Sequence, residues 1–172
     1  MVLVSSLLLL LVVTMIAITM FHSFGTQERI AGNVREKQRA LHAAESAQQY
    51  AEWWLSMGNG GTPITCAAAV TAPSGQICDT KIADVTNVPW MVGGAETGVI
   101  YAPPQMNVST TVGAGTYYKS PSFYIAYVGL TPDGKTSVYQ IDAVGYGGRP
   151  DAVAVVESTY KVRVGVIDIG LP

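Results

Sequence analysis

The chain has 172 residues, enough for one domain with an anchor, and its 10 lysines and arginines nearly balance its 12 aspartates and glutamates. This balance argues against a nucleic-acid partner held by bulk electrostatics, which requires a concentrated basic face. Charged residues make up only 13% of the chain. Beyond the N-terminal segment, a composition rich in Gly, Thr, Ser, Val and Tyr is typical of an extracytoplasmic, β-rich domain.

The N-terminal segment, residues 1–24, is apolar apart from small hydroxyls and one histidine, and the first charged residue is Glu28. As a helix it would span about 36 Å, more than the roughly 30 Å hydrocarbon core of a bilayer. We therefore expect a membrane span. A cleavable signal peptide is the alternative, but it would need a positive start, a shorter apolar core and a small-residue cleavage site.

No basic residue precedes the apolar segment, although a single-span protein normally carries Lys or Arg on its cytoplasmic side. We therefore expect that a short basic leader has been removed and that Met1 is a mature N-terminus.

Residues 25–57 continue the helix in amphipathic form, since charges fall between apolar residues that recur near the helical period. This predicted packing stripe comprises Ile30, Val34, Leu41, Ala44, Ala51 and Leu55. The run Gly58-Asn59-Gly60-Gly61 predicts the helix end. Of the two tryptophans before it, we expect one to pack under the following domain and the other to face a partner.

Residues 58–121 are rich in Gly, Pro and Thr, which predicts a loop-rich region and leaves its fold open. It contains the two cysteines of the chain, Cys66 and Cys78. A pair beyond a membrane anchor predicts a disulfide in an oxidising compartment, closing a loop of roughly 13 residues and stabilising by about 3 kcal/mol. Two buried free thiols are the alternative.

Residues 122–172 predict an antiparallel meander, because β-branched and aromatic runs alternate with short turns. The expected strands are Ser122–Leu130, Ser137–Tyr146 and Ala152–Val164. In the last strand Val156, Tyr160, Val162 and Val164 lie on one side and Glu157, Thr159, Lys161 and Arg163 on the other, as in a sheet with one buried face. The expected fold class is α+β, a lollipop with the long helix packed on the sheet.

Three segments resemble the PilX-type minor pilins within the type IV pilin-like proteins. They are Thr26–Asn33 (TQERIAGN), Arg39–Ala47 (RALHAAESA) and the run from Tyr139 through Tyr160 with its GYGG turn. Residues 62–118 show no recognisable match. The resemblance implies the pilin plan of a long helix and a C-terminal sheet. It also implies leader cleavage by the prepilin peptidase and methylation of the new N-terminus at Met1.

One position departs from the pilin pattern: most pilins carry Glu at the fifth mature residue, and this chain has Ser5. In major pilins that carboxylate is thought to pair with the N-terminal amine of a neighbouring subunit, since an unpaired charge in apolar surroundings is costly. Its absence implies a subunit at the filament tip. The alternative is that Ser5 is one more small residue tolerated in the span.

No catalytic constellation is recognisable: His22 and His42 lack triad or ligand partners, and Asp133, Asp142 and Asp151 are too scattered for a calcium loop. The glycine runs 58–61 and 145–148 lack a phosphate-loop lysine and are assigned to turns. No enzyme activity, metal or cofactor is expected.

The expected function is therefore structural: a minor pilin that promotes pilus assembly, with consequences for adhesion and twitching motility. The resemblance implies other minor pilins, the major pilin and a large tip adhesin as partners. It places the chain in the inner membrane with its C-terminal domain periplasmic, and later in the extracellular pilus. The alternatives are a binding module for DNA or a surface, located in residues 62–118, and a pseudopilin of type II secretion.

Overall fold

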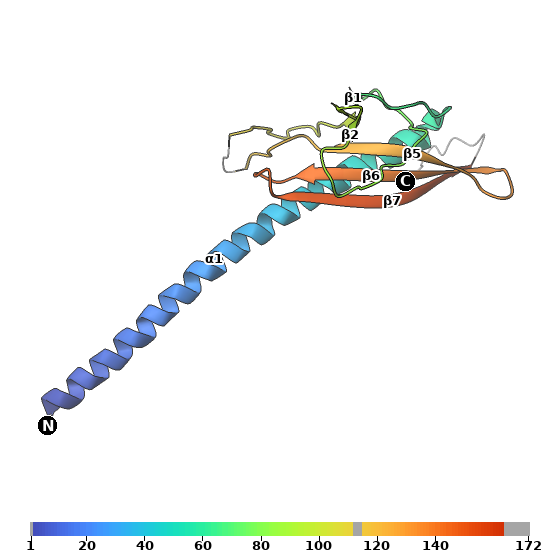
Figure 1. Ribbon diagram of the computed structural model, residues 1–172. Helices are drawn as coiled ribbons and strands as arrows, with labels where there is room; N and C mark the ends of the chain where they lie inside the picture. Colours follow the sequence, from blue (N-terminus) through green and yellow to red (C-terminus); the bar gives the residue numbers. More distant parts are fainter. Residues whose placement is uncertain (1, 112–114, 164–172) are drawn as a thin grey trace. The chain divides into compact units, whose positions relative to one another are not determined.

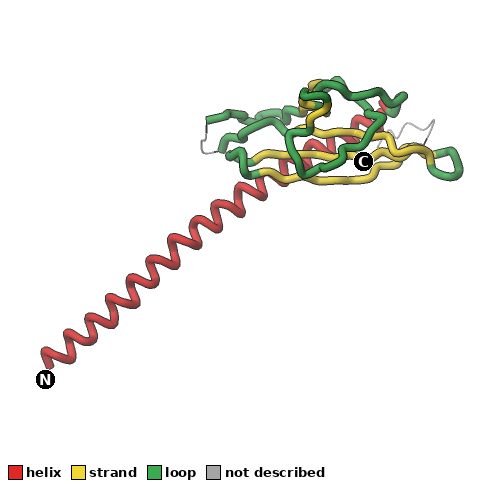
Figure 2. Tube along the Cα trace, viewed as in Figure 1, coloured by secondary structure: helices red, strands yellow, loops and turns green. Residues whose placement is uncertain are grey.

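The computed structural model describes residues 2–111 and 115–163 (Figure 1). The chain divides into two units at residue 35, which we treat separately and call the helical unit (residues 2–35) and the head (residues 36–163). The long helix α1, Val2–Trp54, contributes to both, as Figure 2 shows in red. Met1 and Val164 lie outside the described residues.

The long helix ends where the glycine run predicted. A π-helical turn, η1 (Leu55–Asn59), follows α1, and Gly58 within it has a φ of 85°. This left-handed conformation suits glycine, which has no Cβ to clash with the preceding carbonyl. The Asn59 side-chain amide donates to the Trp54 carbonyl at 2.8 Å and supplies one of the partners that a helix end lacks.

The head contains a five-stranded sheet in the order β1-β4-β5-β6-β7. Its strands are β1 (Ala69–Thr71), β4 (Gly98–Ile100), β5 (Ser122–Leu130), β6 (Thr136–Tyr146) and β7 (Val153–Arg163). The pair β1–β4 is parallel and the other neighbours are antiparallel. A separate hairpin joins β2 (Met91–Val92) to β3 (Ala95–Glu96).

The predicted meander is confirmed as β5, β6 and β7, and with it the α+β class of a long helix on an antiparallel sheet. In β7 the even-numbered residues from 154 to 162 are buried or half-buried, and the odd-numbered residues from 157 to 163 are exposed, as predicted. The loop-rich region, however, adds β1 and β4 to the sheet. These strands have three residues each, too short to produce a periodic sequence pattern.

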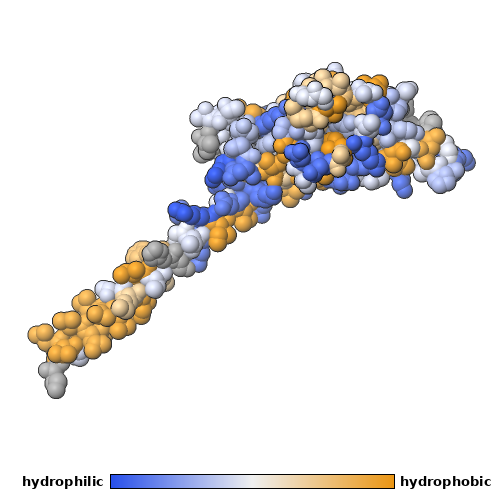
Figure 3. All heavy atoms as spheres, in the orientation of Figure 1, coloured by the Kyte–Doolittle hydropathy of each residue, from blue (hydrophilic) through white to orange (hydrophobic). Residues whose placement is uncertain are grey.

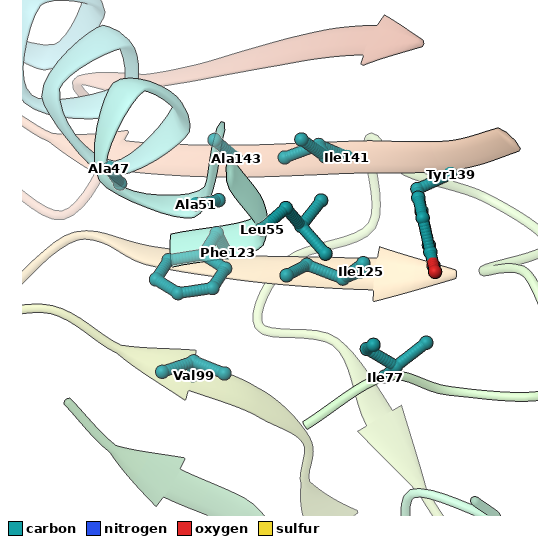
Figure 4. Packing of buried hydrophobic residues seen from close by; sticks show 10 residues of the cluster. All are labelled: Ala47, Ala51, Leu55, Ile77, Val99, Phe123, Ile125, Tyr139, Ile141 and Ala143. Atoms are coloured by element: carbon teal, nitrogen blue, oxygen red, sulfur yellow. The ribbon is translucent and has the colours of Figure 1, made fainter. Parts of the chain in front are cut away.

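The centre of the sheet is covered on both faces, so a single buried face describes only its edge. Helix residues Ala47, Ala51 and Leu55 pack on one face, as Figure 4 shows. The opposite face carries Tyr124, Ala126 and Val144, which pack with residues of the loop-rich region. This explains why consecutive residues of β5 and β6 are buried: burial on both faces removes the alternation that marks a half-exposed strand.

The stripe of α1 that contacts the sheet consists mainly of alanines. The fully buried residues are Ala40, Ala44, Ala47, Ala51 and Leu55. The prediction is correct for Ala44, Ala51 and Leu55 and wrong for Leu41, which is 39% exposed, and for Ile30 and Val34, which are exposed in the helical unit. The ranking of residues by size misled the prediction, because a helix that approaches a sheet closely needs small side chains at the contact.

Gly145 lies within β6, directly under the backbone of α1. A Cβ at this position would overlap the Ala40 carbonyl oxygen and the Ala44 nitrogen, and would stand 2.9 Å from the Ala43 carbonyl carbon. The assignment of residues 145–148 to a turn is therefore wrong for Gly145. Only glycine leaves room for the helix here, since main-chain atoms cannot move aside as a flexible side chain can.

Replacing Gly145 by alanine should lower the free energy of unfolding of the head by about 2 kcal/mol or more, because the added methyl forces helix and sheet apart. The matched control is Gly61→Ala, where the nearest atom to a Cβ is 4.0 Å away, and it should change stability by less than about 0.5 kcal/mol. Denaturant unfolding of the detergent-solubilised chain measures both. Equal stability of the two variants would contradict the close approach.

Candidate functional site

The helical unit exposes an apolar surface along residues 2–24, orange in Figure 3. Its large side chains are mostly more than half exposed, among them Leu7, Leu10, Ile16 and Phe21. By length and composition this part of α1 could cross a membrane. A surface of this kind is stable only against lipid or against other apolar helices.

Ser5 lies within this apolar surface and satisfies its own hydroxyl. Its Oγ donates to the Val2 carbonyl oxygen at 2.8 Å, and Ser6 bonds to Leu3 in the same way at 2.9 Å. A hydroxyl bonded within its own helix needs no partner from a neighbouring molecule, whereas a carboxylate in the same surroundings would. Position 5 is therefore neutral and self-sufficient.

Cys66 and Cys78 form a disulfide, with their Cα atoms 5.4 Å apart. Both are buried on the sheet face opposite the helix, in a cluster with Trp90 and Tyr124. The backbone of Cys78 bonds directly to β5: its N–H donates to the Ile125 carbonyl oxygen at 2.7 Å. The disulfide thus fastens the loop-rich region to the sheet.

An ionic cluster holds the start of the head helix to the turn between β6 and β7. The Glu36 carboxylate accepts from the Gly148 N–H at 2.6 Å and from the Arg39 guanidinium at 2.9 Å. Arg39 in turn donates to the Thr116 carbonyl oxygen at 2.6 Å and lies 4.5 Å from the centre of the Tyr117 ring. Such charge-assisted bonds are stronger than neutral ones and fix orientation.

Sequence reasoning did not find this cluster. Glu36 and Arg39 were among several charges on a solvated helix, and nothing in their spacing shows that they reach residues more than seventy positions away. The usable signal was the GYGG string, because closely spaced glycines mark places where another backbone approaches.

The two tryptophans at the end of α1 differ as expected. Trp54 is half-buried and packs under the head: a Cβ at Gly75 would stand 2.5 Å from its ring. Trp53 is 53% exposed, and its ring centre lies 5.4 Å from that of Tyr50, which stacks on Tyr101 at 4.4 Å. Trp53 therefore presents an aromatic surface that a rigid stack supports.

The histidines contribute no recognisable catalytic arrangement. His42 is exposed, and its Nδ1 lies 3.2 Å from a carboxylate oxygen of Glu45, one turn away on the same helix. The side chain of His22 lies outside the part of the chain that the structure describes.

Comparison with protein families gives two matches that together cover nearly all of these features. Residues 1–48 match "PilX N-terminal", and residues 44–162 match "Type IV pilus assembly protein PilX C-term". The chain belongs to the PilX family of type IV pilus assembly proteins. No curated protein and no solved structure matches it.

Family membership changes the interpretation of residues 62–118. They showed no recognisable resemblance, yet they lie inside the PilX match of residues 44–162. The structure shows why this region belongs to the fold: it provides β1, β4 and the disulfide that cover the second face of the sheet. PilX proteins are pilus assembly proteins, a structural family, and pilus components are therefore the partners that membership implies.

The PilX head also buries one carboxyl group. Asp142 of β6 is fully buried, and its oxygens accept from the Gln140 amide at 3.1 and 3.3 Å. Burial raises the pKa of Asp142 because it disfavours the charged form, and Glu157 raises it further, while the Gln140 bond and Lys81 act in the opposite direction.

This raised pKa predicts how head stability depends on pH. The folded state favours protonated Asp142, so the stabilisation is fully present below the ordinary carboxyl pKa and is lost as pH rises through the folded value. Asp142→Asn should therefore raise the free energy of unfolding at pH 7, on the order of 1 kcal/mol, and flatten its pH dependence above pH 4.

Asp133 is the matched control. It is exposed in a turn, and its pKa is lowered by bonds from the Thr131 hydroxyl and the Lys135 N–H. Asp133→Asn should not stabilise the head at neutral pH. Denaturant unfolding at a series of pH values measures both variants, and a loss of stability at pH 7 in Asp142→Asn would overturn the assignment.

Proposed function

We propose that this chain is a minor pilin that promotes pilus assembly from a complex at the filament tip. It is held in the inner membrane by residues 1–24, with its head in the periplasm, and then enters the extracellular pilus. The observation that carries the proposal is the uncharged residue at position 5 of an apolar helix in a PilX family member.

The physical basis is the cost of an unpaired charge. A subunit inside a filament can pair an acidic residue with the amine of a neighbour, whereas a subunit at the tip has no neighbour above it. Ser5 avoids this cost, since its hydroxyl already bonds to the Val2 carbonyl. A chain of this kind suits a first subunit, on which others assemble.

Entry into the filament can be nearly neutral in free energy. Residues 2–24 exchange contacts with lipid chains for contacts with apolar helices, and these are similar in polarity. Cleavage by the prepilin peptidase and methylation at Met1 accompany this role. The partners we propose are other minor pilins, the major pilin and a large tip adhesin.

The role is tested by the number of surface pili. Deleting the gene should abolish or sharply reduce piliation, and the wild-type gene should restore it. In the deleted strain Ser5→Glu should fail to restore it, because a tip subunit would carry an unpaired carboxylate in an apolar environment.

Two controls separate position from composition. Ser5→Ala removes the hydroxyl without adding charge and should restore piliation. Ser6→Glu places the same carboxylate one residue away and shows whether any added charge blocks membrane insertion, which quantification of the membrane-bound protein also reports. Full piliation of the deleted strain, or of a strain with Ser5→Glu, would count against a tip role.

A further inference from the structure

The outer edge of β7 is a long strand edge without a partner among the described residues. β7 has 11 residues and lies at one end of the sheet, next to β6 only. Soluble proteins usually shorten, bulge or cover such an edge, because its free backbone groups can pair with another chain. Here the ladder between β6 and β7 runs without a register shift from Thr136 to Tyr146.

The register identifies which backbone groups of β7 face outward. The Gly147 N–H bonds to the Ala152 carbonyl oxygen at 2.7 Å, so this pair is a bonded pair of the hairpin. Bonded and non-bonded pairs alternate in an antiparallel ladder, which assigns the even-numbered residues of β7 to β6 and directs the odd-numbered ones outward. The Lys37 ammonium bonds to the Val153 carbonyl, an outward group in this assignment.

The side chains along this edge also lack a neighbour on the outer side. On the helix face Val156, Tyr160 and Val162 are only half-buried, although the residues beside them on β6 are mostly buried. An additional strand would cover this row and remove apolar surface from water. The apolar face of the sheet thus continues to its edge.

The opposite face of the edge carries charge. Glu157 lies near the middle of β7, and Lys161 and Arg163 lie toward its end, all exposed. Cross-strand neighbours of opposite charge stabilise a pair, and like charges destabilise it. The complementary segment therefore has apolar residues on the helix face and carboxylates opposite Lys161 and Arg163.

A second copy of the chain does not fit this edge. Glu36 lies at Gly148 and Ala44 at Gly145, while Gly60 lies at Tyr139, so the head helix runs antiparallel to β6 and parallel to β7. Antiparallel pairing of two β7 strands would set two head helices in opposite directions. Two copies anchored in one membrane enter their heads from the same side.

We propose that β7 binds an extended segment of a different pilus protein, which adds to the sheet as a further strand. Main-chain bonds to the odd-numbered residues from Val155 to Arg163 provide the affinity, and the alternating apolar and charged rows provide the selectivity. This proposal rests on the proposed function, since it specifies the contact through which the subunit joins its partners.

Amide hydrogen exchange tests the contact directly. The full-length chain is compared alone in detergent and in the pilus complex isolated with mild detergent. The amides of Val155, Glu157, Thr159 and Lys161 should exchange rapidly in the isolated chain and at least tenfold more slowly in the complex. Equal exchange in both samples, or protection already present in the isolated chain, would overturn the proposal.

A proline substitution provides the functional test. Thr159→Pro removes an outward N–H and should leave the melting temperature nearly unchanged, as proline is tolerated on edges that face solvent. Ser158→Pro removes an N–H directed at β6 and should lower it markedly. In the deleted strain Thr159→Ala should restore piliation, and Thr159→Pro should not.

The outcomes distinguish the two proposals. A fully piliated deletion strain contradicts the pilus assembly role itself. A deletion strain without pili that Thr159→Pro restores to the wild-type number contradicts strand addition and leaves the assembly role intact.

Discussion

The close contact between α1 and β6 at Gly145 is the constraint on which the head depends. Main-chain atoms of Ala40, Ala43 and Ala44 occupy the space that a side chain at position 145 would fill. This approach requires glycine on the strand and alanine on the helix, and it brings Glu36 within 2.6 Å of the Gly148 N–H. Packing and electrostatics thus fix the same end of the helix.

Other features of the head follow from this contact. With the helix seated on one face, Phe123 and Ile125 of β5 and Ile141 of β6 are buried against it. Alternate residues of the same strands then face the other side, where the disulfide and Trp90 cover them. Two covered faces stabilise a small sheet better than one, since more apolar area leaves water. β7 is the strand that remains open.

The sequence predicted the elements whose periodicity extends over many residues. The helix, the three long strands and the alternation in β7 were visible because one face of each differs from the other. The contact stripe was predicted only in part: Leu41 was included for its hydrophobicity, yet the close approach excludes it and selects Ala40 and Ala47.

The remaining features depend on residues distant in sequence. The strands β1 and β4 form because the disulfide region folds over the sheet, and three residues give no detectable period. The contacts of Glu36 with Gly148 and of Arg39 with Thr116 link positions that no local pattern connects. For the same reason Asp142 looked like a scattered carboxylate, although it is fully buried in β6.

A head organised around one helix–sheet contact should unfold as one cooperative unit. Native-state hydrogen exchange at increasing denaturant measures this directly, by comparing amides of Ala44 and Ala47 in the helix with those of Phe123 and Ile141 in the sheet. All four should open with the same free energy, equal to that of global unfolding. Opening of the helix amides at a clearly lower free energy, with the sheet still protected, would contradict the central role of the contact.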